Sequence, residues 1–147
     1  MHTKLAQGTI GYVLEESASD AYVFDATDCH FVFVNRGARD NLGYAMSELA
    51  ELTPWDLKPN FSRAAFLELV APLRRGKQQS ITFETVHRRK DGSDYDAFVN
   101  LQVINTEPER LFYAAIQDIS ERKSAERGSH DGKLQRAPGA TVRLRAT

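Results

Sequence analysis

Three segments rich in β-branched and aromatic residues follow one another with no helical pattern between them, and they constrain the fold most. They cover residues 80–88, 95–104 and 111–119. The first two are joined by residues 90–93, where Gly92 can take the positive φ of a tight hairpin turn. Because strands joined by short turns run antiparallel, this region predicts an antiparallel sheet.

A second pair of strand candidates precedes these three, at residues 21–25 and 31–34. The segments between the two pairs are helical in pattern. Asn35 can cap a short helix over 36–42 that Gly43 closes, Ser47–Leu52 is typical of a second capped turn, and Pro54 and Pro59 punctuate the segment around Trp55. Phe66, Leu69, Val70 and Leu73 step i, i+3, i+4, i+7 and predict a longer helix, with Pro72 bending or shortening its last turn. Five antiparallel strands with helices on one face make an α+β domain.

The N-terminal segment also has helical periodicity. Ile10, Val13, Leu14 and Ser17 lie on one face, and Glu15 and Glu16 lie on another. The three apolar residues have no other obvious place to be buried. We therefore expect Ile10, Val13 and Leu14 to form a homodimer contact.

Composition limits the classes of function. The chain has 147 residues, a net charge of −1 and one cysteine, Cys29. The charge balance gives no basic footprint for nucleic acid, no apolar run reaches the roughly 18 residues of a membrane span, and no secretory signal is visible. The expectation is one cytoplasmic domain with no metal site. The charge is uneven, because residues 1–121 carry 12 basic and 18 acidic side chains and residues 122–147 carry 7 and 2.

Several short motifs occur in a specific order. They are Asn35, Leu42-Gly43-Tyr44, Leu57-Lys58-Pro59, Phe83-Glu84, Arg89-Lys90-Asp91-Gly92-Ser93 and Gln117-Asp118-Ile119-Ser120-Glu121-Arg122-Lys123. Together they resemble the PAS sensory-domain family over about residues 18–123. The resemblance implies strand order 2-1-5-4-3, with small helices and a cavity on one face. It also implies a sensory module, not an enzyme, that binds a ligand or dimerises and modulates an output domain.

The closing motif implies a link from the sheet to an output helix. Asp118 ends a strand, and its carboxylate could pair with a cation such as Arg89 or Lys90. Ser120 can cap the following helix, with Glu121 in the first turn. Asp118 and Ser120 are therefore the expected signal-relay residues, the other interpretation being an ordinary surface ion pair and cap.

The candidate cavity lining is mainly apolar, and a filled core explains the same pattern without a ligand. The candidates are Trp55, Phe66, Val70, Phe83, Val99, Leu101, Phe112 and Ala114. Cys29 is expected as a partly exposed thiol in the first hairpin turn, away from the positions of reactive cysteines in flavin-binding relatives, which argues against covalent flavin. Haem is disfavoured because residues 61–73 contain no His and His87 is expected at the solvent end of its strand. Non-covalent flavin or a small apolar metabolite stays open.

An enzyme of the ketosteroid-isomerase type, a small α+β cone, is the alternative fold. It would need an inward acid, and the strand parity of Glu84 relative to Phe83 points Glu84 outward. The sequence analysis therefore predicts an N-terminal helix over 1–17, a PAS domain over 18–121, and an output helix with a disordered basic tail over 122–147. The predicted function is ligand or partner sensing relayed through dimerisation, for a histidine kinase (two-component signalling) or diguanylate cyclase (cyclic-dinucleotide signalling) output. The alternative is an interaction domain with a filled core.

Overall fold

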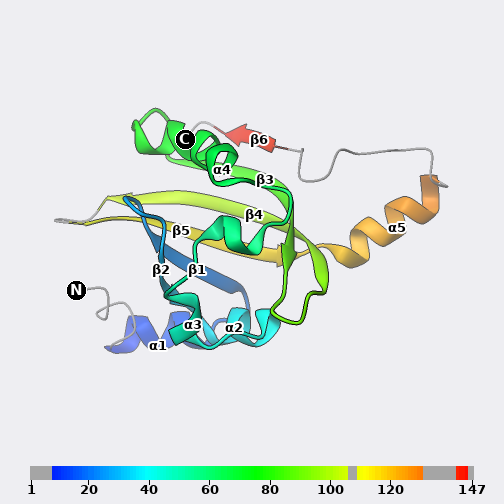
Figure 1. Ribbon diagram of the computed structural model, residues 1–147, viewed down its shortest axis with the longest axis horizontal. Coiled ribbons are helices and arrows are strands. Elements are labelled where there is room, and N and C mark those ends of the chain that lie inside the picture. The colour runs from blue at the N-terminus through cyan, green and yellow to red at the C-terminus, as the bar shows by residue number, and fades with distance from the viewer. Residues whose placement is uncertain (1–7, 106–108, 131–141, 146–147) are drawn as a thin grey trace.

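The computed structural model describes residues 8–105, 109–130 and 142–145. One antiparallel sheet runs through the molecule, with helices against it (Figure 1). The strands are β1 (Asp20–Asp25), β2 (Phe31–Val34), β3 (Ser80–Arg88), β4 (Asp94–Asn105), β5 (Arg110–Asp118) and β6 (Val142–Arg145). The helices are α1 (Gly8–Glu16), α2 (Arg36–Leu42), α3 (Met46–Leu49), the 3₁₀ turn η2 (Pro54–Leu57), α4 (Arg63–Arg74) and α5 (Ser120–His130).

The first five strands have the order β2-β1-β5-β4-β3, which confirms the predicted topology. β3 and β4 pair along their whole shared length, from Ser80 opposite Gln102 to Arg88 opposite Asp94. The turn between them contains Gly92 at φ 92°, a left-handed conformation that costs glycine no Cβ clash. The two halves of the chain meet where β1 pairs with β5 at the centre of the sheet.

Helix α2 begins and ends where the sequence predicts, whereas α3 begins one residue before the predicted Ser47–Leu52 turn and ends at Leu49. Asn35 accepts a hydrogen bond from Ala38 N at the start of α2, and Gly43 closes the helix at φ 83°. Ser62 caps α4 in the same way through Ala65 N. Pro72 lies in the last turn of α4, where the helix continues only to Arg74.

At the C-terminal end, where the sequence predicts a disordered tail, residues Val142–Arg145 form a sixth strand, β6. β6 pairs with Ser80–Phe83 of β3 at the edge of the sheet. The edge of β3 offers unpaired backbone groups, and Val142–Arg145 alternates aliphatic and charged residues as an edge strand does. The rest of the expected tail, residues 131–141, lies outside the described residues.

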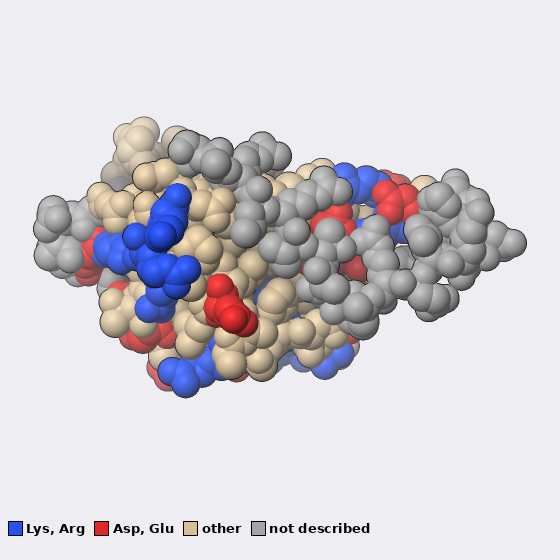
Figure 2. Space-filling model, turned by 90° about the horizontal axis from the view of Figure 1, so that it is seen from above, with Lys and Arg blue, Asp and Glu red and all other residues tan. Residues whose placement is uncertain are grey.

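The core lies between the sheet and the layer of α2, α3, η2 and α4. Its largest fully buried side chains include Tyr22, Phe24, Phe31, Phe66, Phe83 and Phe112. On the opposite face of the sheet, Leu14 of α1 packs with Val23, Phe33 and Leu111. The surface charge is also uneven, because Lys and Arg side chains gather on part of the face seen in Figure 2.

Candidate functional site

Most of the predicted cavity-lining residues surround a single interior space. Phe66, Phe83, Val99, Leu101 and Ala114 line it. Val70 and Phe112 lie in the same buried core without lining the space, and Trp55 packs on that core with its ring centroid 5.9 Å from that of Phe66. Five of the eight predicted residues thus line the space itself.

The interior space is small. It has room for about 10 Å³, which is about one water molecule. A flavin or haem is many times larger, and neither would enter without a large displacement of the aromatic residues that close the core.

Two polar residues in this core were not among the predicted site residues. Lys58, directly after η2, lines the space, and its Nζ lies 3.0 Å from His87 Nε2 of β3. On the other side of the ring, His87 Nδ1 lies 3.4 Å from Tyr22 Oη and 3.2 Å from Tyr95 Oη. Lys58, His87, Tyr22 and Tyr95 thus form a buried polar chain through an otherwise apolar core, and we call these four residues the interior polar cluster.

The expectation that His87 lies at the solvent end of its strand is wrong, since its exposed fraction is 0%. The reason is strand parity. His87 follows Ile81, Phe83 and Thr85 at every second residue, so it faces the core with them. That parity was visible in the sequence, whereas nothing in the sequence indicated that Lys58 would be buried, because lysine is among the residues most often exposed.

Burial dominates the electrostatics of this cluster. It lowers the pKa of Lys58 to about 7, and burial together with the nearby Lys58 charge holds the pKa of His87 well below its usual range. Burial also raises the pKa of Tyr95 to about 12 and holds that of Tyr22 well above its usual value. His87 and both tyrosines are therefore neutral near pH 7, and Lys58 is the only member of the cluster that changes charge there.

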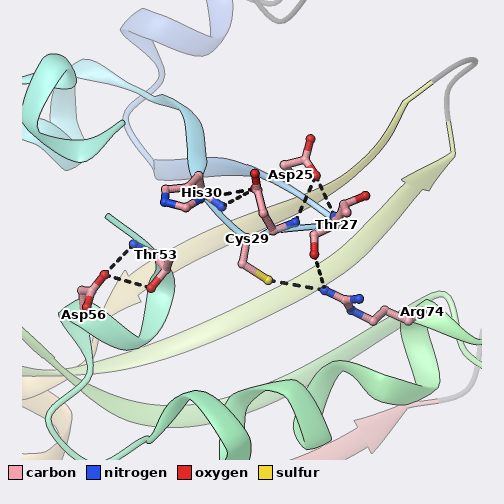
Figure 3. Close-up of polar contacts among 8 residues, drawn as sticks. Asp25, Thr27, Cys29, His30, Thr53, Asp56 and Arg74 are labelled. Atoms are coloured by element: carbon pink, nitrogen blue, oxygen red, sulfur yellow. Dashed lines mark hydrogen bonds and ion pairs between the residues drawn. The ribbon is translucent and has the colours of Figure 1, made fainter. Parts of the chain in front are cut away.

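The turn before Lys58 is held by its own cap. Asp56 accepts hydrogen bonds from both the backbone nitrogen and the hydroxyl of Thr53, at 2.8 and 2.9 Å (Figure 3). Pro54 occupies the first turn, where its missing N–H is no loss. This cap fixes η2, and the Lys58 backbone then closes it with a bond to Trp55 O.

Cys29 lies in the turn between β1 and β2, as predicted, but it is not a partly exposed thiol. Its exposed fraction is 1%, because the turn directs the side chain inward, where Arg74 Nη2 lies 3.7 Å from the sulfur (Figure 3). Burial raises the pKa of this thiol, with Arg74 opposing the shift. A buried thiol of raised pKa is poorly reactive.

The expected relay residues lie where the sheet passes into α5. Asp118 Oδ1 accepts a hydrogen bond from Ser120 N at 2.9 Å, so Asp118 supplies the cap predicted for Ser120. Ser120 Oγ instead accepts from the backbone nitrogen of Asp96 in β4 at 3.1 Å, and Ile119 N donates to Asp96 O at 2.9 Å. The start of α5 is thus tied to β4 by two hydrogen bonds.

The cations predicted as partners of Asp118 have other contacts. Arg89 bonds Asn41 and Ser93, and Lys90 pairs with Glu48 at 2.6 Å. The predicted ion pair between Asp118 and Arg89 or Lys90 is therefore not formed. These contacts tie the β3–β4 hairpin to α2 and α3 instead.

Glu84 faces outward from the core, as its parity predicted, and it contacts the first turn of α5. Its Oε1 lies 2.6 Å from Lys123 Nζ, and its Oε2 lies 3.4 Å from Arg122 Nη2. The Lys123 side chain is 11% exposed, so this ion pair is partly shielded from water. It gives α5 a second attachment, to β3.

Helix α1 is attached through α2 and exposes part of its apolar face. Asn35 Nδ2 donates to Leu14 O at 2.9 Å, and Arg39 binds both carboxylate oxygens of Glu15 at 2.9 and 2.7 Å. Leu14 is partly buried against the sheet, but Ile10 is 72% and Val13 58% exposed. Two of the three residues predicted for a dimer contact are therefore uncovered in the single chain.

The chain was compared with known proteins and solved structures. The PAS domain family model matches residues 19–121. The PAS domain of an HTR-like protein from Haloarcula marismortui is 28% identical, with a TM-score of 0.65 over 73% of this chain and 86% of that one. No curated protein matches.

Two more distant structures share the fold. A PAS domain from a two-component sensor histidine kinase is 17% identical, with a TM-score of 0.62 over 73% of this chain and 90% of that one. An RNA-binding Light-Oxygen-Voltage receptor is also 17% identical, with a TM-score of 0.72 over 88% of this chain and 37% of that one. The match of the family model over most of the chain, together with the observed strand order, is decisive: the chain belongs to the PAS domain family.

Proposed function

We propose that this PAS domain is a non-catalytic sensory module of the cytoplasm that acts as a homodimer and passes its signal from the sheet into α5. The observation that carries the proposal is the distribution of exposed apolar side chains. Within the described residues, the exposed large hydrophobic residues are Ile10, Tyr12 and Val13, and all three belong to α1. A cluster of this kind beside an otherwise polar surface is typical of a protein interface.

A second copy of the chain is the partner that we propose for α1. The helix is fixed to its own domain by Asn35 and Arg39, so its exposed face is presented in a defined position. Two such faces, related by a two-fold axis, can cover each other, as an isologous interface requires. Among the described residues, no helix has both the length and the apolar character to cross a membrane.

The output route that we propose runs through the attachments of α5. Ser120 and Glu84 connect this helix to β4 and β3, the two strands that carry Tyr95 and His87 of the interior polar cluster. A shift of these strands would move the start of α5 with them. A histidine kinase or diguanylate cyclase domain is the proposed recipient, and the histidine kinase origin of one structural neighbour supports the first of these.

A single charge introduced into the exposed face of α1 tests the proposed dimer. Val13→Asp places a carboxylate in the proposed interface and should weaken dimerisation at least tenfold, measured as molar mass by light scattering over a concentration series. Ala64→Asp adds the same charge at an exposed position of α4, on the other side of the sheet from α1, and should leave the mass unchanged. An unchanged dimer for Val13→Asp, or a monomeric wild type, would refute the proposed contact.

A specific observation favours a second candidate function, an interaction domain with a filled core. The interior space has room for only about one water molecule. Binding of non-covalent flavin, which the sequence did not exclude, would require the core side chains to move apart. Native mass spectrometry and a visible absorption spectrum of the purified protein test this, since a yellow protein with the mass of a bound flavin would contradict a filled core.

A further inference from the structure

The interior space has one charged group in its wall. Apart from Lys58, its lining is largely aromatic and aliphatic, with Phe66 and Phe83 on opposite elements. Lys58 Nζ lies 5.6 Å from the centroid of the Phe66 ring and 3.0 Å from His87 Nε2. Within the described residues, no carboxylate contacts Lys58 Nζ, so the ammonium has no partner of opposite charge.

An ammonium in such a place is unfavourable without a counter-ion. Transferring an ion from water to an apolar interior is costly unless a charge of opposite sign and hydrogen bonds compensate. The titratable groups that face Lys58, directly or through His87, are Tyr22 on β1, His87 on β3 and Tyr95 on β4, and none of these is an anion near pH 7. Lys58 thus has a hydrogen-bond partner in His87 but, within the described residues, no anion beside it.

Thr85, near the space but not in its lining, is another buried polar group whose pairing is incomplete. It lies on the inner face of β3, between Phe83, which lines the space, and His87, which contacts Lys58. The residue is 3% exposed, and its Oγ1 has no hydrogen-bond partner. A buried hydroxyl without a partner is rare in folded proteins, so this part of the core is incompletely paired.

We propose that Lys58 and the surrounding core form a binding site for a small monatomic, monovalent anion, chloride. The anion accepts hydrogen bonds from the Lys58 ammonium and is enclosed by the apolar wall. The size follows from the volume of about 10 Å³, and the single charge follows from the single ammonium. This site would supply the input of the sensory module proposed above, although binding itself does not depend on dimerisation.

Anion binding would fix the hydrogen-bond direction of the interior polar cluster. With Lys58 protonated, His87 Nε2 accepts from the ammonium, so the ring proton is on Nδ1 and is donated to a tyrosine oxygen. Tyr95 adjoins Asp96, whose backbone holds Ser120 and Ile119 at the start of α5. Hydrogen bonds thus connect the proposed site to Tyr95, and the next residue along the chain, Asp96, holds the start of α5.

The affinity should depend on pH in a defined direction. Only the ammonium form of Lys58 attracts an anion, and burial lowers the pKa of Lys58 to about 7. Above that pH, each unit removes about nine-tenths of the remaining ammonium, so the apparent dissociation constant should rise about tenfold per unit. Bound anion in turn raises the pKa of Lys58, because it stabilises the charged form.

The test is a chloride titration monitored at two groups. The single tryptophan, Trp55, reports by fluorescence, and selectively ¹³C-labelled lysine reports the pKa of Lys58 by NMR. At pH 6.5, with sodium chloride exchanged for sodium sulfate at constant ionic strength, chloride should give a saturable change at both and raise the pKa of Lys58 by about one unit or more. Sulfate, which is larger and divalent, should give no saturable change.

Two variants make the result specific. Lys58→Met keeps an unbranched side chain of similar length without charge, and it should abolish the fluorescence response while an amide NMR spectrum shows that the domain is folded. Lys77→Met, at an exposed position, should respond like the wild type. A linear response, a response retained in Lys58→Met, or no response to chloride in the wild type would overturn the proposal.

The failure of this inference can be told apart from the failure of the proposed dimer. The titration is repeated on Val13→Asp, in which the interior is unchanged. Chloride binding in a monomeric Val13→Asp protein supports the anion site alone, whereas a wild-type dimer that does not respond to chloride overturns only the anion site.

Discussion

Lys58 Nζ and His87 Nε2 lie 3.0 Å apart inside the core, and both residues are almost completely buried. Burial lowers the pKa of both groups, and the Lys58 charge lowers that of His87 further. His87 therefore stays neutral and serves as a hydrogen-bond acceptor for the ammonium. When Lys58 is protonated, the contact is therefore a hydrogen bond from a charged ammonium to a neutral imidazole.

The first prediction concerns the pH dependence of stability. The pKa of Lys58 is about 7 in the folded chain and near its ordinary value of 10.5 in the unfolded chain. Between these values the unfolded state binds the proton that the folded state has lost, so the free energy of unfolding rises with pH, by about 1.4 kcal/mol per unit from this group. Urea unfolding at pH 7, 8 and 9, in a buffer without chloride, should show this rise.

Lys58→Met should lack that rise and should be more stable than the wild type at pH 7, because it no longer buries an ammonium. Lys77→Met, which changes an exposed lysine, should keep the wild-type slope. Parallel stability profiles for the wild type and Lys58→Met would contradict the assigned burial of the Lys58 charge.

Thr85 gives a second prediction about the same core. Its hydroxyl has no partner, so Thr85→Val, which has nearly the same shape, removes an uncompensated polar group. The free energy of unfolding should rise by about 1 kcal/mol, measured by urea unfolding in anion-free buffer. Thr85→Ser keeps the hydroxyl but removes a buried methyl group, and it should destabilise the domain. A loss of stability in Thr85→Val would show that the hydroxyl has a partner in solution.

The sequence predicted the parts of this fold that depend on local pattern. The alternation in β3 and β4 and the helical spacing of Phe66 and Leu73 each fix which side of an element is buried, so the sheet and α4 follow from them. Strand parity also predicts that His87 points inward, but its position near the hairpin suggested that it would be exposed to solvent. Parity was the better guide, because the inner face of β3 stays covered as far as His87.

Other features depend on contacts between distant segments, and local pattern does not encode those. Lys58 is buried because η2 places it over β3, 29 residues further along the chain. β6 pairs with β3 across more than 50 residues, and its four residues are too few to give a clear strand signal. The sequence predicts Ser120 as the cap of α5, but Asp118, two residues earlier, supplies it. Both residue types can cap a helix, so local pattern does not distinguish them.

The third prediction concerns Asn35, which links three elements. Its Oδ1 accepts from Ala21 N at 3.0 Å and Ala38 N at 3.2 Å, and its Nδ2 donates to Leu14 O and Ser19 O. Asn35→Ala leaves these buried groups without partners and should lower the free energy of unfolding by about 3 kcal/mol. Urea unfolding measures the change.

Asn35→Asp separates the two halves of this network. The carboxylate can still accept from Ala21 and Ala38, but it cannot donate to Leu14 and Ser19. Amide hydrogen exchange should therefore accelerate in α1 more than in α2. Equal exchange in both helices, or a cost below 1 kcal/mol for Asn35→Ala, would show that α1 is held by other contacts.

The last prediction concerns the link from the sheet to α5. Ser120→Ala removes the acceptor for Asp96 N, and Asp118→Ala removes the cap on Ser120 N. Each should weaken the first turn of α5 by about 1 kcal/mol, which is about a fivefold faster exchange of the Lys123 amide, whose hydrogen bond to Ile119 O closes that turn. Ser124→Ala, at an exposed position of the same helix, is the matched control and should leave the exchange unchanged.

Because the Val99 amide lies deeper in β4, its exchange should stay slow in all three variants. Acceleration of Val99 together with Lys123 would mean that these variants loosen the whole sheet, and Ser120 and Asp118 would then be parts of the fold rather than a separate joint between sheet and helix.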